Sequence, residues 1–181
     1  MNIVIVPGYG DRVDYLHRTI RNWPDRFGNK AVVLPFGWSG EAAEYDKKNK
    51  KFLETIEKMG EVSIIGISAG ASAALRAQHV FPERVGRIVT LCGPVRQDLM
   101  NKEMLRSKYP LLKRSLDDLA LETVPGQDVL TLRPLYDGVV PVEAMIIPGA
   151  VDMRMKMIGH PTSIAWGMYH HAADMNRFLS R

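Results

Sequence analysis

Apolar and polar residues recur along this chain with two periods, one typical of strands and one typical of helices. Short apolar runs rich in β-branched residues predict buried strands. These runs cover residues Asn2–Val6, 30–34, Val62–Ile67, 86–91 and 128–132. Between and after them, apolar residues return every three or four positions, which predicts helices. The helical segments cover residues 11–23, Tyr45–Met59, 69–78, 97–121 and 161–179, and Pro110 interrupts the fourth of them.

The segment 151–158 shows a different pattern, in which apolar and charged residues alternate strictly. Its apolar positions are Val151, Met153, Met155 and Met157, and its charged positions are Asp152, Arg154 and Lys156. Such alternation predicts a strand with one buried and one solvated face, and outward charges are a common feature of edge strands. We therefore interpret the methionines as core residues and predict no metal site.

The order of these segments predicts the architecture. Alternating strands and helices are typical of a mainly parallel, twisted sheet with helices on both faces. We expect an α/β protein with about six strands in a three-layer α/β/α sandwich, formed by a single domain over residues 1–181. Segment 97–121 is expected to supply a crossover helix and a small lid, and core packing of both helices is the alternative. In such folds, ligands bind at the carboxyl ends of the strands.

The most informative stretch joins the strand Val62–Ile67 to the helix that follows it. Here Gly66-Ile67-Ser68-Ala69-Gly70 matches the pattern G-x-S-x-G. In a strand–turn–helix context this pattern predicts a nucleophile elbow, a strained turn that exposes its serine above the sheet. The alternative is a glycine-rich turn with a solvated serine. The elbow makes Ser68 the candidate nucleophile.

Composition excludes several other classes of protein. The formal net charge of +4 and the sequence pI of about 9.2 are only mildly basic. Because no long Lys/Arg stripe interleaves with aromatic residues, nucleic-acid binding is not indicated. Cys92 is the single cysteine, so no internal disulfide can form, and we interpret it as an inert core residue. The apolar run Ile3 to Val6 is too short for a signal peptide or a membrane span, which favours a cytoplasmic protein.

A second loop of interest, Pro7-Gly8-Tyr9-Gly10, follows the first strand. A dinucleotide fingerprint would need another glycine at position 13, where the chain has Val13, and no phosphate loop is present. We interpret the segment as an oxyanion loop, whose backbone N–H groups would face the elbow. An ordinary strand-to-helix turn is the alternative.

Two further candidates each follow a predicted strand. Asp137 lies in the loop after 128–132, and His160 lies just after 151–158, so 23 residues separate them. Serine needs a base to act as a nucleophile at neutral pH, and histidine needs an acid to hold its tautomer and stabilise its cation. The chain order serine, aspartate, histidine is that of one hydrolase class.

Other residues could take these roles. Asp98, which follows the strand ending near Cys92, is the alternative acid. His170 and His171 lie inside the predicted last helix, where histidines are usually structural. Ser39 has no elbow around it. The motifs therefore favour Ser68, Asp137 and His160.

Together these motifs make the chain resemble the α/β-hydrolase superfamily, in a small form without a large cap. The resemblance rests on the Pro7–Gly10 loop, the elbow, Asp137-Gly138-Val139-Val140-Pro141 and Gly159-His160, and it covers almost the whole chain. It implies that Ser68 is the nucleophile, His160 the general base and then acid, and Asp137 the orienting carboxylate. It also implies that the Tyr9 and Ala69 amides form an oxyanion hole. Many family members have a histidine where this chain has Pro7.

The expected substrate is a small-molecule ester or thioester of a small or medium acyl group, hydrolysed through an acyl-enzyme without a metal or cofactor. Residues expected to contact it are Gly8, Gly10, Trp38, Met100 and Met104. The same three residues would also support an acyltransferase or an amidase. The chain could also be a non-catalytic binding module on this fold.

Overall fold

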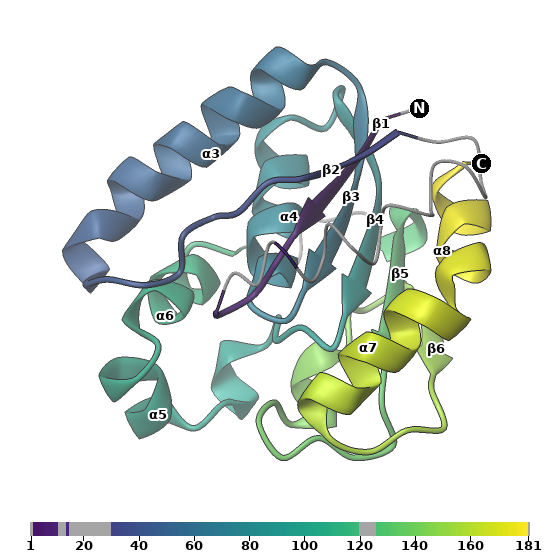
Figure 1. Ribbon diagram of the computed structural model, residues 1–181. Helices are drawn as coiled ribbons and strands as arrows, with labels where there is room; N and C mark the ends of the chain where they lie inside the picture. Colours follow the sequence, from purple (N-terminus) through teal and green to yellow (C-terminus); the bar gives the residue numbers. More distant parts are fainter. Residues whose placement is uncertain (1, 11–13, 15–29, 120–125, 181) are drawn as a thin grey trace.

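The computed structural model of the protein describes residues 2–10, 14, 30–119 and 126–180. Its centre is a sheet of six parallel strands in the order β2-β1-β3-β4-β5-β6 (Figure 1). The strands are β1 (Asn2–Val6), β2 (Lys30–Val33), β3 (Val62–Ile67), β4 (Val85–Leu91), β5 (Val129–Arg133) and β6 (Val151–Arg154). The predicted α/β architecture is confirmed. The predicted helix over residues 11–23 lies outside the described residues.

Helices cover both faces of this sheet. On one face lie α3 (Tyr45–Met59), α4 (Gly70–Val80) and α6 (Pro110–Asp117), and on the other lie α7 (His160–His170) and α8 (Ala172–Leu179), while α5 (Lys102–Ser107) precedes α6 (Figure 1). Short 3-10 helices complete the described elements: η1 (Ala42–Glu44), η2 (Gln97–Leu99), η4 (Gly126–Asp128) and η5 (Val142–Met145). The three layers expected from the alternation of strands and helices are present.

The central strands are apolar throughout because both of their faces are covered. Every residue of β3 is buried, and Ile64 and Ile65 have no exposed surface. Full burial of such a side chain stabilises the fold by about 1.5–3 kcal/mol. The sheet therefore forms a rigid base, and the loops at the carboxyl ends of β1, β3, β4 and β5 project from it at one edge.

The segment 151–158 is only partly the strand that its alternation predicts. β6 is an edge strand, as expected, but it ends at Arg154, and Val151 is 50% exposed. Met155 is buried just beyond the strand. Asp152 pairs with Arg133 of the neighbouring strand, with N–O distances of 2.7 and 2.6 Å. Met153 and Met157 are half-buried, and the charged residues Asp152, Arg154 and Lys156 are exposed, so burial follows the predicted alternation except at Val151.

Two predicted helices are divided in the structure. Segment 97–121 contains η2, α5 and α6, and Pro110 is the first residue of α6, where its missing N–H costs no hydrogen bond. Residues 120 and 121 lie outside the described part. Segment 161–179 breaks at His171, where φ is −101° and ψ is 11°. Among the described residues, none of the helices is long and apolar enough to cross a membrane. The single domain and the cytoplasmic location remain predictions.

Candidate active site

The turn between β3 and α4 has the strained geometry expected of an elbow. Ser68 has a φ of +51°, a left-handed conformation that is uncommon for a residue with a side chain. Its amide donates to the Leu91 carbonyl at 2.9 Å, and its carbonyl accepts from the Ala71 amide at 3.0 Å. These bonds hold the strained turn between the ends of β3 and β4 and the start of α4.

Close packing explains the glycines of the turn. A Cβ atom on Gly70 would lie 2.1 Å from the Val6 carbonyl oxygen, and one on Gly66 would lie 2.6 Å from the Ala71 Cα atom. Both distances are far shorter than a van der Waals contact, and both involve backbone atoms. Glycine is therefore required at both positions, which lets α4 begin directly against β1 and β3.

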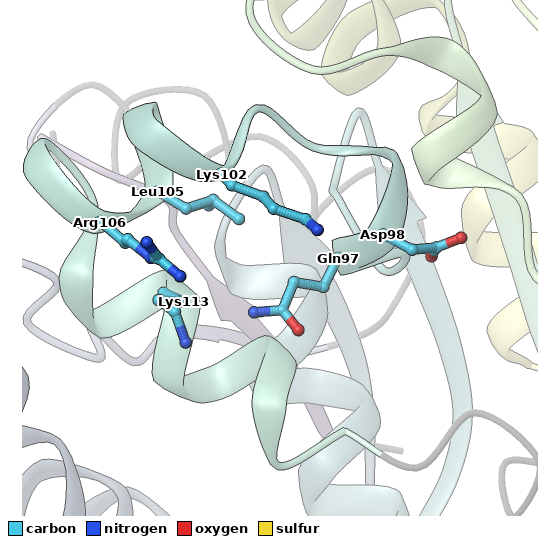
Figure 2. Close-up of a pocket in the computed structure, with 6 residues that line it drawn as sticks. All are labelled: Gln97, Asp98, Lys102, Leu105, Arg106 and Lys113. Carbon is cyan, nitrogen blue, oxygen red and sulfur yellow. The ribbon is translucent and has the colours of Figure 1, made fainter.

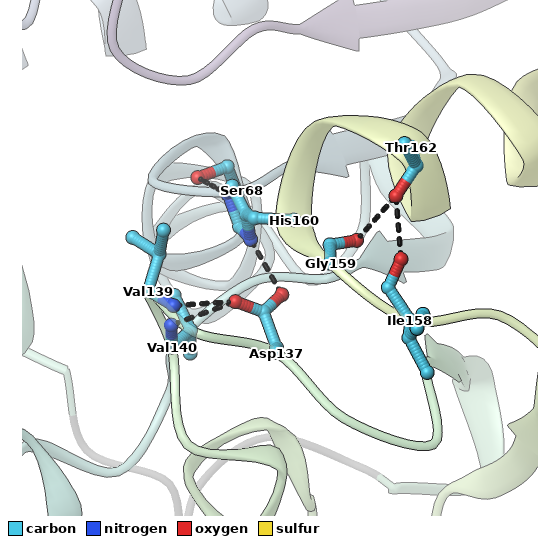
Figure 3. A network of polar contacts seen from close by, with 8 residues as sticks. All are labelled: Ser68, Asp137, Val139, Val140, Ile158, Gly159, His160 and Thr162. Atoms are coloured by element: carbon cyan, nitrogen blue, oxygen red, sulfur yellow. Dashed lines mark hydrogen bonds and ion pairs between the residues drawn. The ribbon is translucent and has the colours of Figure 1, made fainter.

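Ser68, His160 and Asp137 form a continuous chain of hydrogen bonds, although the sequence separates them by up to 92 residues (Figure 3). The Ser68 Oγ atom lies 2.8 Å from His160 Nε2, and His160 Nδ1 lies 2.6 Å from Asp137 Oδ2. Ser68 comes from the elbow, Asp137 from the loop after β5, and His160 from the first residue of α7. The structure brings together the three residues that the motifs singled out.

Asp137 is held by its own loop as well as by His160. Its Oδ1 atom accepts hydrogen bonds from the Val139 amide at 2.8 Å and the Val140 amide at 3.0 Å (Figure 3). Burial alone would raise the pKa of the Asp137 carboxyl. The hydrogen bonds from His160, Val140 and Val139 outweigh it and leave the pKa below its ordinary value. The carboxylate is therefore ionised at neutral pH, and one of its oxygens faces the imidazole.

The Pro7–Gly10 loop lies directly against the elbow. A Cβ atom on Gly8 would lie only 2.7 Å from the Ser68 Cβ atom. The Trp38 indole donates a buried hydrogen bond of 2.9 Å to the Pro7 carbonyl and stacks on Phe36 at a centroid distance of 4.2 Å. The Tyr9 ring lies between Trp38, at 6.0 Å, and Tyr109, at 4.6 Å. A row of aromatic rings thus connects the core to this loop and to the N-terminal end of α6.

Ser68 opens into a cavity of about 540 Å³, here named the Ser68 cavity. Its walls are mostly apolar. They come from the Pro7–Tyr9 loop, the elbow, the loop after Asp137, the start of α7, and residues 100–117, which contain α5 and α6 and are here named the α5–α6 segment. The lining residues are Pro7, Gly8, Tyr9, Ile67, Ser68, Ala69, Pro94, Met100, Met104, Tyr109, Leu112, Val139, Val140, His160, Pro161, Ile164 and Ala165.

The residues expected to contact substrate fall into two groups. Gly8, Met100 and Met104 line the Ser68 cavity, whereas Trp38 and Gly10 do not. Trp38 is 1% exposed and supports the Pro7 carbonyl from below the loop, so its predicted place in the cavity wall is wrong. Gly10 instead turns the chain with a φ of +91°. A buried aromatic residue can support a loop of the site from below without lining the cavity. The sequence pattern of one segment does not distinguish these two positions.

The alternative acid and histidines have other partners. Asp98 is exposed and pairs with Arg96 at 2.8 Å. The His171 Nδ1 atom lies 3.1 Å from Asp174 Oδ2, and the His170 ring stacks on Trp166 with a centroid distance of 3.5 Å. His170 ends α7, which begins at His160, and eleven helical residues span about 15 Å. The structure therefore places neither histidine of this pair beside Ser68.

Two features of the site are absent from the sequence interpretation. The first is the pair of Val139 and Val140 amides that hold Asp137 from two and three residues further along the chain. This is the spacing of an Asx-type turn, which the dipeptide Asp137-Gly138 could have predicted. Tyr109, just before α6, and Leu112 of α6 line the cavity, and no motif marks them. Cys92 is buried beside the site, and burial raises the pKa of its thiol. Among the described residues, no group of three metal-ligating side chains occurs.

Comparison with solved structures identifies the fold. A metagenome-derived lipolytic enzyme superposes with a TM-score of 0.71 at 13% identity, covering 97% of this chain and 93% of the other. A monoacylglycerol lipase of Paleococcus ferrophilus gives 0.68 at 14% identity, covering 99% and 94%. The chain has the α/β-hydrolase fold. The RedJ thioesterase of Streptomyces coelicolor shares this fold with a TM-score of 0.60 at 15% identity, covering 99% and 90%.

The α/β-hydrolase fold confirms the structural side of the resemblance seen in the motifs. No protein-family model matches this sequence, and no curated protein matches it either. At identities of 12–17%, likeness to these structures concerns the fold, and function has to be argued from the site.

Proposed function

We propose that this protein is a serine hydrolase that cleaves an ester or thioester of a small or medium acyl group through an acyl-enzyme on Ser68. The observation that carries the proposal is the hydrogen-bonded chain from Ser68 Oγ through His160 to Asp137, with distances of 2.8 and 2.6 Å, at the floor of an apolar cavity. Nucleophile, base and orienting acid are each within hydrogen-bond reach of the next, as this chemistry requires.

In the first step, His160 Nε2 takes the Ser68 proton as Oγ attacks the carbonyl carbon of the substrate. Asp137 accepts a hydrogen bond from Nδ1–H, which directs the lone pair of Nε2 toward serine and stabilises the imidazolium that forms. The low pKa of the Asp137 carboxyl keeps this acceptor charged while it is buried. His160 then gives the proton to the departing alcohol or thiol, and an acyl-enzyme remains.

The tetrahedral intermediate needs donors for its negative oxygen. We assign this role to the amides of Tyr9 and Ala69, two residues that line the cavity next to Ser68. In the loops and turns that the structure describes, neither amide donates to a backbone carbonyl. In the second half of the reaction, water loses a proton to His160 and attacks the acyl-enzyme, and the acid leaves.

The cavity walls favour an apolar acyl group. Met100, Met104 and Leu112 from the α5–α6 segment, together with Ile164 of α7, form a flexible apolar surface around the serine. We interpret the α5–α6 segment as a small lid. Solved structures of the same fold include proteins described as lipases and a thioesterase, which supports an ester or thioester substrate.

Labelling with a fluorophosphonate, located by mass spectrometry, tests the nucleophile directly, and Ser68→Ala is the matched control. A series of p-nitrophenyl esters of rising chain length then tests the substrate class, and kcat/KM is expected to be highest for short to medium chains. Labelling at another serine, or labelling without turnover of any ester, thioester or amide, would contradict the proposal. Faster release to an amine or alcohol acceptor than to water would indicate an acyltransferase with the same site.

A further inference from the structure

A second pocket of about 310 Å³ lies beside α5 and α6, outside the Ser68 cavity. We name it the basic pocket; its lining residues are Gln97, Asp98, Lys102, Leu105, Arg106 and Lys113. Figure 2 shows Arg106 and Lys113 close together between the two helices and Lys102 extending toward Gln97, while the Asp98 carboxylate points away from them. Positive side chains therefore converge on one small concave surface.

The two nearby carboxylates are paired with Arg96 and with Lys113, one of the cations of the pocket itself. Asp98 receives two hydrogen bonds from Arg96, at 3.0 and 2.8 Å. Asp117 lies 2.6 Å from Lys113 Nζ and 2.5 Å from the Gln97 amide nitrogen. Among the described residues, no carboxylate lies within ion-pair distance of Lys102 or Arg106. Lys102 and Arg106 are therefore two exposed cations of the pocket without an ion-pair partner among the described residues.

Helix stability does not explain the position of Lys102. It is the first residue of α5, where the helix dipole disfavours a positive charge. Arg106 follows one turn later on the same face, and Leu105 between them is buried at the pocket floor. Lys102 and Arg106 therefore border the pocket from successive turns of α5.

The basic pocket and the Ser68 cavity share the same two helices. On α5, Met104 lines the Ser68 cavity, and the next two residues line the basic pocket. On α6, Leu112 lines the Ser68 cavity and Lys113 the basic pocket. A ligand that reaches over this helical segment could place an apolar end near Ser68 and a charged end among the cations.

We propose that the basic pocket binds a phosphate group carried by the thiol part of an acyl thioester substrate. A phosphate dianion matches the two cations of α5, and Arg106 offers the planar fork that binds phosphate oxygens in pairs, with Lys102 as a point charge. This inference rests on the proposed function and names the substrate class for it. Free phosphate is the other possible source of the same chemistry.

The test compares two thioesters with the same acyl group, butyryl-CoA and butyryl-pantetheine, of which only the first carries phosphates. We expect the wild-type ratio of their kcat/KM values to be roughly tenfold or more in favour of the CoA thioester, since two partly solvated ion pairs supply about that much. In the double variant Lys102→Gln, Arg106→Gln this ratio should fall toward one. Added salt should also reduce the wild-type ratio.

The matched control is the double variant Lys47→Gln, Lys51→Gln on α3. It removes two exposed lysines at the same spacing of four residues and changes the net charge equally. The control should keep the wild-type ratio. A wild-type ratio near one, or an equal fall in both double variants, would overturn the proposal.

Calorimetric titration with CoA and with inorganic phosphate separates the two sources. Binding of CoA that weakens in the Lys102/Arg106 variant supports a substrate site. Binding of inorganic phosphate without any preference for the CoA thioester would overturn the substrate assignment.

Hydrolysis of p-nitrophenyl butyrate reports on the proposed function separately. If that activity is present and neither thioester reacts, only the thioester inference fails. If no substrate reacts, the proposed function fails, and absence of CoA binding would then refute the basic pocket as well.

Discussion

The elbow and the α5–α6 segment border the same cavity but are held in place in very different ways. Around Ser68, backbone hydrogen bonds hold the turn, and a Cβ atom added at Gly66 or Gly70 would lie less than 3 Å from backbone atoms. The α5–α6 segment consists of two short helices with surface pairs such as Lys113–Asp117. Exposed pairs of this kind contribute about 0–1 kcal/mol each.

This difference indicates that the two regions have different roles. The strain at Ser68 persists only because several contacts with the surrounding sheet and helix fix the conformation of the turn. We therefore assign the proposed chemistry to the elbow, which is the more rigid of the two regions. The α5–α6 segment offers adaptable methionines on one face and cations on the other, so we expect it to affect which substrate is chosen. The following predictions test whether the two regions differ in this way.

Replacing the serine should have the largest effect. We expect Ser68→Ala to lower kcat for p-nitrophenyl butyrate by at least about 10⁴-fold, because the acyl-enzyme can no longer form. The melting temperature should change little, since the substitution removes one partly exposed hydroxyl. The measurement is steady-state turnover together with thermal unfolding. Turnover within a few-fold of wild type in folded protein would assign the nucleophile elsewhere.

The acid should come next. Asp137→Asn keeps the shape but favours the wrong imidazole tautomer, and kcat should fall by up to about 10⁴-fold. Asp98→Asn is the matched control on the α5–α6 side and should lower kcat less than about twofold, because its partner Arg96 is exposed. The comparison uses kcat at one pH for the three proteins. A larger loss in the Asp98 variant would transfer the acid role to the earlier loop.

A methyl group at the elbow tests how tightly the rigid side is packed. Gly70→Ala would place Cβ 2.1 Å from the Val6 carbonyl oxygen, so we expect the free energy of unfolding to fall by about 3 kcal/mol or more. Gly138→Ala is the control, because a Cβ there meets no atom within 4 Å. Denaturant unfolding of both variants checks this. Similar stability for the two would mean that the elbow adjusts easily and that the contrast with the α5–α6 segment is smaller than we infer.

Alkaline pH should weaken the contact between α3 and α6. Tyr45 is 1% exposed and packs beneath Arg114 of α6, and burial raises its pKa to about 12 from 10.0. Because the folded pKa is raised, the stabilisation is complete below pH 10, and it falls as the pH rises from 10 toward 12. The loss for this group is up to about 2.7 kcal/mol.

The matching experiment measures denaturant unfolding at pH 8 and pH 11 for wild type and Tyr45→Phe. The variant should lose less stability over this interval. An equal loss in both proteins would mean that Tyr45 is not the group responsible.

The smallest effect concerns the support beneath the oxyanion loop. Trp38→Phe removes the hydrogen bond to the Pro7 carbonyl while keeping an aromatic ring, and such a bond is worth about 1 kcal/mol. We expect kcat to fall by roughly tenfold or less with little change in KM. The shifted Tyr9 amide would weaken a hydrogen bond to the substrate oxygen that forms mainly in the transition state. Phe36→Leu, which leaves that hydrogen bond in place, should retain kcat. A fall in stability without a fall in kcat would give Trp38 a structural role only.

Local sequence patterns determined the elbow and the elements around it. Gly66, Ser68 and Gly70 are within five residues of one another, and their turn requires close backbone contact that only small residues permit. The continuous apolar runs of β3 and β4 likewise predicted strands covered on both faces. Such features depend on neighbours along the chain, so they can be predicted from the order of residues alone.

Tertiary structure decided which residues face the Ser68 cavity. By sequence, Trp38 is a loop aromatic and Tyr109 belongs to the predicted helical segment 97–121. Neither pattern shows that Trp38 supports Pro7 from the core and that Tyr109 lines the cavity. The same holds for α5, where adjacent residues Met104 and Leu105 border different pockets. Strand order and helix docking set these places through contacts between distant segments, and no local period carries that information. The sequence therefore determined the proposed chemical groups, and the packing of the sheet and helices decided their surroundings.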